Sequence, residues 1–118
     1  MDGEVGQTLL DGFNGTGIKA IGFWENGFRE VTNNTKEIVN PSDLAGMKIR
    51  TMENPVHMAT YEALGATPTA MAWGEIFSAL QQGTVDGQEN PIAIIYTARV
   101  HEVQKFCSMI DLIYSPCV

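Results

Sequence analysis

The stretch Gly46-Met47-Lys48-Ile49-Arg50-Thr51-Met52-Glu53-Asn54-Pro55 contains the signals that decide the fold. We expect a strand over residues 47–51. Asn54 is a favourable N-cap residue and Pro55 a favourable first helical residue, so a helix is expected to begin directly after the strand. A strand followed at once by a capped helix is the repeating unit of an α/β protein.

The same alternation continues to the end of the chain. Hydrophobic patterns and turn residues predict further strands and two more helices, which begin at Trp73 and after Asn90. The expected strands cover residues 18–23, 28–32, 67–71, 85–89 and 106–114. In the helix after Asn54 the spacing predicts a buried stripe of Val56, Ala59, Thr60, Ala63 and Leu64. Strands and helices that alternate in this way predict right-handed βαβ units and a mostly parallel sheet flanked by helices.

Length and charge exclude several classes of protein. A chain of 118 residues favours one domain that buries its own core. The formal charge is −7 with only seven Lys and Arg, which argues against nucleic acid and against an anionic membrane surface. No stretch approaches the roughly 18 apolar residues of a membrane helix, so direct membrane insertion is not expected. No signal peptide is recognisable in this chain, and both of its ends look like cuts through a longer protein.

Two polar residues stand where strands give way to helices. Arg50 lies near the end of one predicted strand, and Asn90 directly follows another. Ligands of open α/β sheets bind beyond the carboxyl ends of the strands, where helix N-termini present free N–H groups. A cation and an amide at two such ends predict a receptor site for a small carboxylate. The alternatives are a surface ion pair for Arg50 and a simple N-cap before Pro91 for Asn90.

Several segments together resemble the solute-binding proteins of TRAP (tripartite ATP-independent periplasmic) transporters, of the dicarboxylate and sialic-acid type. The resemblance is carried by Gly22-Phe23-Trp24-Glu25-Asn26-Gly27-Phe28-Arg29, Asp43-Leu44-Ala45-Gly46-Met47-Lys48-Ile49-Arg50, Ala63-Leu64-Gly65-Ala66-Thr67-Pro68-Thr69, Ala79-Leu80-Gln81-Gln82-Gly83-Thr84-Val85-Asp86-Gly87-Gln88-Glu89-Asn90-Pro91 and His101-Glu102-Val103-Gln104-Lys105-Phe106. Such proteins have two lobes, and the resemblance covers mainly the second. It implies that residues 1–118 form a single α/β lobe of periplasmic-binding-protein type.

The resemblance also implies roles for four residues. Arg50 is similar to the arginine that clamps the substrate carboxylate, and Asn90 to the amide that binds the same group. Arg29 is similar to a second ligand-contacting arginine, and Trp73 to an aromatic residue against the ligand. The alternatives from the residues alone are a solvated strand-edge side chain for Arg29 and a core side chain for Trp73. The chain departs from the pattern at Asp111-Leu112, which puts the crossover there in doubt.

The function implied is capture of an organic acid without catalysis, in the periplasm, for delivery to the membrane permease subunits of the transporter. No Ser–His–Asp or Cys–His grouping is present, and no cofactor is implied. Glu53 and His57 alone make poor evidence for a metal site. Cys107 and Cys117 are expected to be free. The alternative is an orphan fragment that mainly self-associates through exposed inter-lobe surface.

Overall fold

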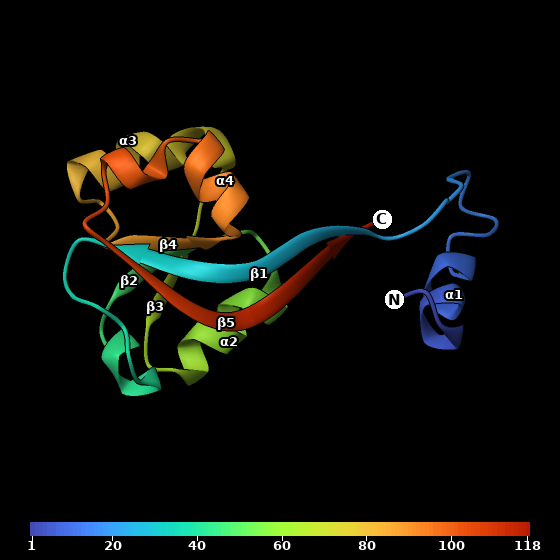
Figure 1. Ribbon diagram of the computed structural model, residues 1–118, viewed down its shortest axis with the longest axis horizontal. Helices are drawn as coiled ribbons and strands as arrows, with labels where there is room; N and C mark the ends of the chain where they lie inside the picture. The colour runs from blue at the N-terminus through green and yellow to red at the C-terminus, as the bar shows by residue number, and fades with distance from the viewer.

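A five-stranded sheet in the order β3-β2-β4-β1-β5 forms the centre of the computed structural model, which describes residues Met1–Val118 (Figure 1). The strands are β1 (Trp24–Asn33), β2 (Lys48–Thr51), β3 (Thr67–Ala70), β4 (Gly87–Asn90) and β5 (Phe106–Cys117). The helices are α1 (Glu4–Asp11), α2 (Pro55–Ala63), α3 (Ile76–Gln82) and α4 (Ile92–Thr97), with 3-10 turns η1 (Pro41–Leu44), η2 (Trp73–Glu75) and η3 (Val100–Glu102). Helices α3 and α4 cover one face of the sheet and α2 the other, while α1 lies beyond the far end of β1.

The α/β class is confirmed, and the sheet is mixed. Strand β2 pairs in parallel with β3 and β4, as the alternation of strands and helices predicts. Strand β1 pairs antiparallel with β4 and β5, which corrects the expectation of a mostly parallel sheet. The β1–β5 ladder joins segments that are far apart in the sequence, so local periodicity carries no information about its direction.

The boundaries of β1 differ from the prediction as well. Residues 18–23 form no strand. The turn-forming residues 25–27, which separate the two strands predicted here, lie inside one continuous strand. Gly27 has φ +113°, and the β1–β5 register shifts between Glu25 and Gly27. The turn-like sequence therefore marks an irregularity that bends the strand rather than one that ends it.

Helix α2 begins as predicted but buries a different side. The side chain of Asn54 accepts hydrogen bonds from the backbone N–H groups of Val56 (2.9 Å) and His57 (3.3 Å). Val56, however, is 71% exposed, and the buried residues of the helix are His57 and Tyr61. The predicted apolar stripe is wrong. The side of α2 that faces the sheet carries His57 and Tyr61, which lie one turn apart, and not the stripe that begins at Val56.

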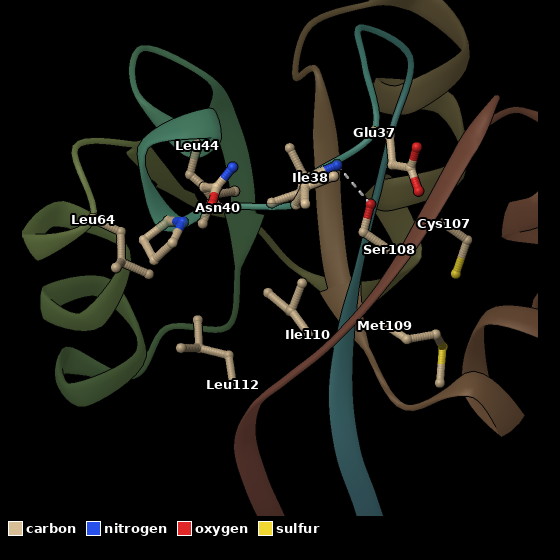
Figure 2. Close-up of a pocket in the computed structure, with 12 residues that line it drawn as sticks. Glu37, Ile38, Asn40, Leu44, Leu64, Cys107, Ser108, Met109, Ile110 and Leu112 are labelled. Atoms are coloured by element: carbon tan, nitrogen blue, oxygen red, sulfur yellow. Dashed lines mark hydrogen bonds between the residues drawn. The ribbon is translucent and has the colours of Figure 1, made fainter.

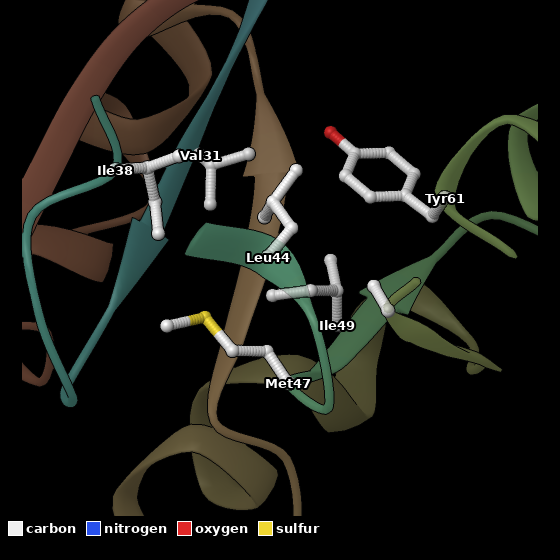
Figure 3. Packing of buried hydrophobic residues seen from close by; sticks show 7 residues of the cluster. Val31, Ile38, Leu44, Met47, Ile49 and Tyr61 are labelled. Carbon is white, nitrogen blue, oxygen red and sulfur yellow. The ribbon is translucent and has the colours of Figure 1, made fainter. Parts of the chain in front are cut away.

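The hydrophobic core has two parts, one on each face of the sheet. Under α2 and η1 lie Val31, Ile38, Leu44, Met47, Ile49, Tyr61 and Ala66 (Figure 3). Around α3, α4 and η3 lie Ile76, Ala79, Leu80, Val85, Ile95 and Val100. Burial of these side chains fixes the sheet between its helices and so fixes the edge at which β2 and β4 end.

An irregular bulge in β5 lies opposite Glu30. The register passes from Arg29 opposite Ile113 directly to Val31 opposite Ser108, so β5 has extra residues at this point. The backbone N–H groups of Ile110 (2.6 Å) and Asp111 (3.1 Å) both donate to Oε2 of the buried Glu30 carboxylate. Asp111 has φ +48°, a conformation uncommon for a residue with a side chain. The departure from the family pattern at Asp111 therefore falls on an irregular segment.

Replacement of Glu30 by Ala should destabilise the chain by about 1–3 kcal/mol, because it leaves two backbone donors of the bulge without an acceptor. Glu25→Ala is the matched control, since Glu25 lies exposed in the same strand and makes no side-chain hydrogen bond. Urea unfolding of both variants measures the difference. Equal stabilities would show that the bulge does not depend on the carboxylate.

Candidate functional site

Arg50 and Asn90 lie side by side at the carboxyl edge of the parallel strands. Arg50 of β2 is in register with Gln88 of β4, and Asn90 lies two residues further along β4. Residues two apart on a strand face the same side, so the side chains of Arg50 and Asn90 share a face of the sheet. They border one cavity of about 510 Å³. We call it the edge pocket; its lining residues are Asn26, Arg29, Arg50, Met52, Trp73, Asn90, Ile94, Thr97 and Ala98.

Arg50 is held in place by a backbone carbonyl rather than by an acid. It is 4% exposed, and its Nε (2.9 Å) and Nη2 (2.6 Å) both donate to the carbonyl oxygen of Met71. Nη1 makes no hydrogen bond, so the Nη1–Nη2 side of the guanidinium remains free for a bidentate partner. The alternative of a surface ion pair is wrong, since Arg50 is buried and has no acidic partner.

Burial lowers the pKa of the Arg50 guanidinium, while the carboxylate of Glu89 acts in the opposite direction and the Arg29 cation adds to the lowering. An arginine stays charged at neutral pH in spite of such a shift. The edge pocket therefore contains a permanent, partly desolvated cation, which attracts an anion more strongly than an exposed one does.

Asn90 is the last residue of β4 and not a helix cap. Helix α4 begins at Ile92 behind Pro91, with no side-chain cap. The Oδ1 of Asn90 accepts a hydrogen bond from Nη2 of Arg29 (3.0 Å), and its Nδ2 donates to Oε1 of Gln88 (2.6 Å). Gln88 in turn donates to the hydroxyl of Thr32 (2.9 Å). The amide is thereby fixed in orientation, and one N–H of Nδ2 is left for a ligand.

Arg29 is buried and paired, which excludes the alternative of a solvated strand-edge residue. It is 1% exposed, and its Nε donates to Oε2 of the equally buried Glu89. Its Nη2 donates to Oε1 (3.0 Å) and to the backbone oxygen (3.0 Å) of Glu89 as well as to Asn90. The carboxylate thus compensates the charge of Arg29, whose Nη1 alone makes no hydrogen bond. His57 lies near the pair, with Nδ1 3.7 Å from Oε1 of Glu89.

Trp73 lies at the rim of the pocket rather than in the core. It is 47% exposed and starts η2, and Cζ of Arg50 lies 5.8 Å from the centroid of its ring. This distance is within the range of a cation–π interaction, in which the ring face stabilises the guanidinium. The aromatic side chain therefore both supports Arg50 and forms a flat wall.

The structure brings all four predicted site residues together and adds five that sequence reasoning missed. Three of the added residues, Ile94, Thr97 and Ala98, come from one side of α4, and Asn26 and Met52 come from β1 and from the segment after β2. The spacing of Ile94, Thr97 and Ala98 is that of one helical face and was a usable signal. Hydrophobic spacing instead predicts that Ile92, Ile95, Tyr96 and Arg99 share one side of this helix, and of these four only Ile95 is buried.

A larger groove of about 620 Å³ lies elsewhere and has different chemistry (Figure 2). Its walls come from the segment around Ile38, from Leu44 and Leu64, and from β5 at Ile110 and Leu112. It is mostly apolar and has no Lys or Arg in its lining, so it is not a site for an anion. We call it the apolar groove.

No three residues among His, Cys, Asp and Glu gather in a way that holds a metal ion. No helix has the length and apolar character that crossing a membrane requires. Cys107 and Cys117 are both free and exposed.

An α/β lobe with a buried cation at the carboxyl edge of its parallel strands has the architecture of ligand-binding α/β proteins. Comparison with known families identifies the class of ligand-binding protein. The model described as bacterial extracellular solute-binding protein, family 7, matches residues 1–118, and the chain belongs to this family. The family consists of periplasmic solute-binding proteins of transport systems, not of enzymes.

Individual relatives agree with this assignment. A solute-binding protein of Verminephrobacter eiseniae is 50% identical over 118 residues, which are 100% of this chain and 35% of the relative. A TRAP periplasmic solute-binding protein from Polaromonas sp. JS666, solved with D-erythronate, is 51% identical with a TM-score of 0.94, over 98% of this chain and 38% of that protein. One from Sulfurospirillum deleyianum, with bound succinate, is 42% identical with a TM-score of 0.91, over 98% and 37%. The chain thus spans little more than a third of these relatives.

Removal of the negative charge in Glu89→Gln should destabilise the chain by about 3 kcal/mol or more, because Arg29 then remains buried without its counter-ion. Glu102→Gln is the matched control: Glu102 pairs with Arg99 on the surface (2.6 Å), and an exposed pair contributes about 1 kcal/mol or less. Chemical denaturation compares the two variants. A loss no greater for Glu89→Gln than for Glu102→Gln would contradict the importance of the buried pair.

Proposed function

We propose that the edge pocket is one side of a carboxylate-binding site, in which Arg50 forms a bidentate salt bridge with the ligand. The observation that carries the proposal is the free Nη1–Nη2 side of a buried arginine with no acidic partner. A planar guanidinium matches the two oxygens of a carboxylate, whereas an ammonium does not. Asn90 adds its remaining N–H, Arg29 adds Nη1, and Trp73 forms the wall beside the bound group.

We further propose that residues 1–118 are a single lobe of a two-lobed protein, which encloses the ligand between its lobes. The relatives support this proposal because the chain covers only 35–38% of their length. Closure around the ligand would then shift a hinge equilibrium, and the closed form would dock on the membrane permease subunits of a TRAP transporter. The site of action is the periplasm, as for other family members.

The relatives leave open what the ligand carries besides its carboxylate. D-erythronate is a monocarboxylate with hydroxyl groups, and succinate is a dicarboxylate. The two share the carboxylate that Arg50 is suited to bind, so the proposed function extends to small organic acids in general.

The isolated chain should bind small organic acids with a dissociation constant in the millimolar range or weaker, about −4 kcal/mol, because one lobe supplies only part of the contacts and excludes little water. Arg50→Ala should abolish saturable binding, and Arg50→Lys should not restore it. Titration of the ¹⁵N-labelled chain with D-erythronate and with succinate, followed by NMR, measures both effects.

Arg99→Ala is the control for this titration, since Arg99 is an exposed arginine outside the edge pocket and pairs only with Glu102. It should leave the affinity unchanged. Micromolar binding by the isolated chain would contradict the expected weakness. Binding that survives in Arg50→Ala would contradict the role of the guanidinium.

Self-association is the second candidate property, and the apolar groove favours it. Leu64, Ile110 and Leu112 are only partly buried beside the groove, and large apolar surfaces tend to be covered by other protein. Ile110→Glu should then reduce the association of the chain, which sedimentation velocity measures over a range of concentrations. A wild-type chain that stays monomeric throughout that range would exclude this property.

A further inference from the structure

One buried histidine lies against the ion pair that borders the edge pocket. Resting on the proposed function, we propose that His57 is a positioning residue of this pocket and that its protonation strengthens the binding of an anion there. The proposal depends on the place of the imidazole beside the Glu89 carboxylate and on the bonds that join this carboxylate to the lining of the pocket.

The imidazole of His57 is buried, and one of its nitrogens lacks a partner. Helix α2 turns this side chain towards the sheet, and His57 is 8% exposed. Its Nδ1 lies 3.7 Å from Oε1 of Glu89, which is too long for a hydrogen bond, and has no other partner. Protonation puts an N–H on Nδ1 together with a positive charge, and the carboxylate attracts both. The protonated ring can therefore form the bond that the structure leaves open.

Glu89 and Arg29 connect this imidazole with the edge pocket. Oε1 of Glu89 accepts a hydrogen bond from Nη2 of Arg29 (3.0 Å), and the same nitrogen donates to Oδ1 of Asn90 (3.0 Å). Arg29 and Asn90 both line the pocket. While His57 is neutral, Glu89 balances the charge of Arg29. A protonated His57 shares that carboxylate, so the group of three gains one positive charge beside the pocket.

The other ionisable groups around His57 keep their charge between about pH 5 and about pH 8, the range in which a histidine titrates. They are Glu89 of β4, Arg29 and Glu30 of β1, Arg50 of β2 and Tyr61 of α2. Carboxylates and guanidinium groups are ordinarily charged in this range, and burial raises the pKa of Tyr61, so its hydroxyl stays neutral. Strand β3 contains no ionisable residue, while Glu53, Glu62 and Asp111 on the neighbouring segments are exposed. His57 is therefore the group whose charge changes.

A proton on His57 and an anion at Arg50 favour each other, because the added positive charge lies beside the pocket that the anion enters. The affinity for a carboxylate therefore rises as the pH falls through the titration of His57. By thermodynamic linkage, the bound anion raises the titration midpoint of His57 by the same factor. A histidine that only fills space in the core would give neither effect.

Titration of the ¹⁵N-labelled chain with D-erythronate at several values between about pH 5 and about pH 8 tests the proposal, since this monocarboxylate is ionised throughout the range. The wild-type chain should bind about fivefold more tightly at the acid end, a factor at the lower end of the usual coupling between two sites. His57→Asn keeps an amide nitrogen near the place of Nδ1 but cannot take up a proton. It should bind as the wild type does at about pH 8 and lose most of the gain at low pH.

His101→Asn is the matched control for this pH profile. His101 is exposed, stacks on Tyr96 with the ring centroids 5.5 Å apart, and lies outside the edge pocket. This variant should keep the full gain at low pH. It also accounts for the exposed acids, whose protonation weakens the repulsion of an anion equally in both variants. The dispersion of the NMR spectrum shows that each variant is folded.

The wild-type chain supplies a second measurement that does not depend on the folding of a variant. NMR of the imidazole rings follows the titration of both histidines with and without D-erythronate in large excess over its dissociation constant. The titration midpoint of His57 should rise by about 0.7 of a pH unit, which is the same fivefold factor, because a full unit corresponds to tenfold. The midpoint of His101 should not move.

The outcomes separate the two levels of the proposal. If D-erythronate does not bind at any pH, or if binding survives in Arg50→Ala, the proposed function fails, and the role of His57 with it. If binding depends on Arg50 but His57→Asn and His101→Asn show the same pH profile, only the role of His57 is overturned. A midpoint of His57 that stays constant or falls on binding would overturn that role as well.

Discussion

The buried ion pair between Arg29 and Glu89 is the interaction on which the edge pocket depends. It joins β1 to β4 through two side-chain contacts and a further bond to the backbone oxygen of Glu89. Because Arg29 also donates to Asn90, the same pair fixes the amide that faces the pocket. Buried pairs of this kind contribute little net stability, but they tolerate no loss of one partner. Because Glu89 compensates the charge of Arg29, Arg50 is the only residue that adds net positive charge to the lining of the edge pocket.

Much of the fold was predictable, because capping and turn chemistry are local. Asn54 with Pro55 predicted the start of α2. Glycine is the residue type that commonly ends a helix, and Gly83, with φ +70°, stands directly after α3. The direction of β1 and β5 was not predictable, since it is decided by pairing between distant segments. The buried side of α2 was also missed, because His57 and Tyr61 are less apolar than Val56 and yet face the sheet. Hydrophobic periodicity cannot identify a helix side that packs partly against polar groups.

The grouping of the candidate residues was predictable to a similar extent. Arg50 and Asn90 were chosen as candidates because strand ends that precede helices are a recurrent place for ligands, and both line one pocket in the structure. The side chains that orient Asn90 and balance the charge of the pocket could not be identified from the sequence. Glu89 faces the opposite side of β4 from Asn90, yet it reaches Asn90 through Arg29. The lining residues Asn26 and Thr97 lie more than seventy residues apart in the sequence, and only the packing of α4 beside β1 brings them to one pocket.

In an acidic chain with a buried arginine, the approach of an anion and its retention in the pocket depend on different charges. Over distances beyond the Debye length, about 8–10 Å at physiological ionic strength, salt screens the repulsion that the net charge of −7 creates. At Arg50, which is only 4% exposed, salt screens a close ion pair much less, and the attraction persists. Added salt therefore removes more of the repulsion than of the attraction. Selectivity in such a site comes from the atoms that surround the one free guanidinium edge, because the long-range field of the chain disfavours every anion and a dianion most.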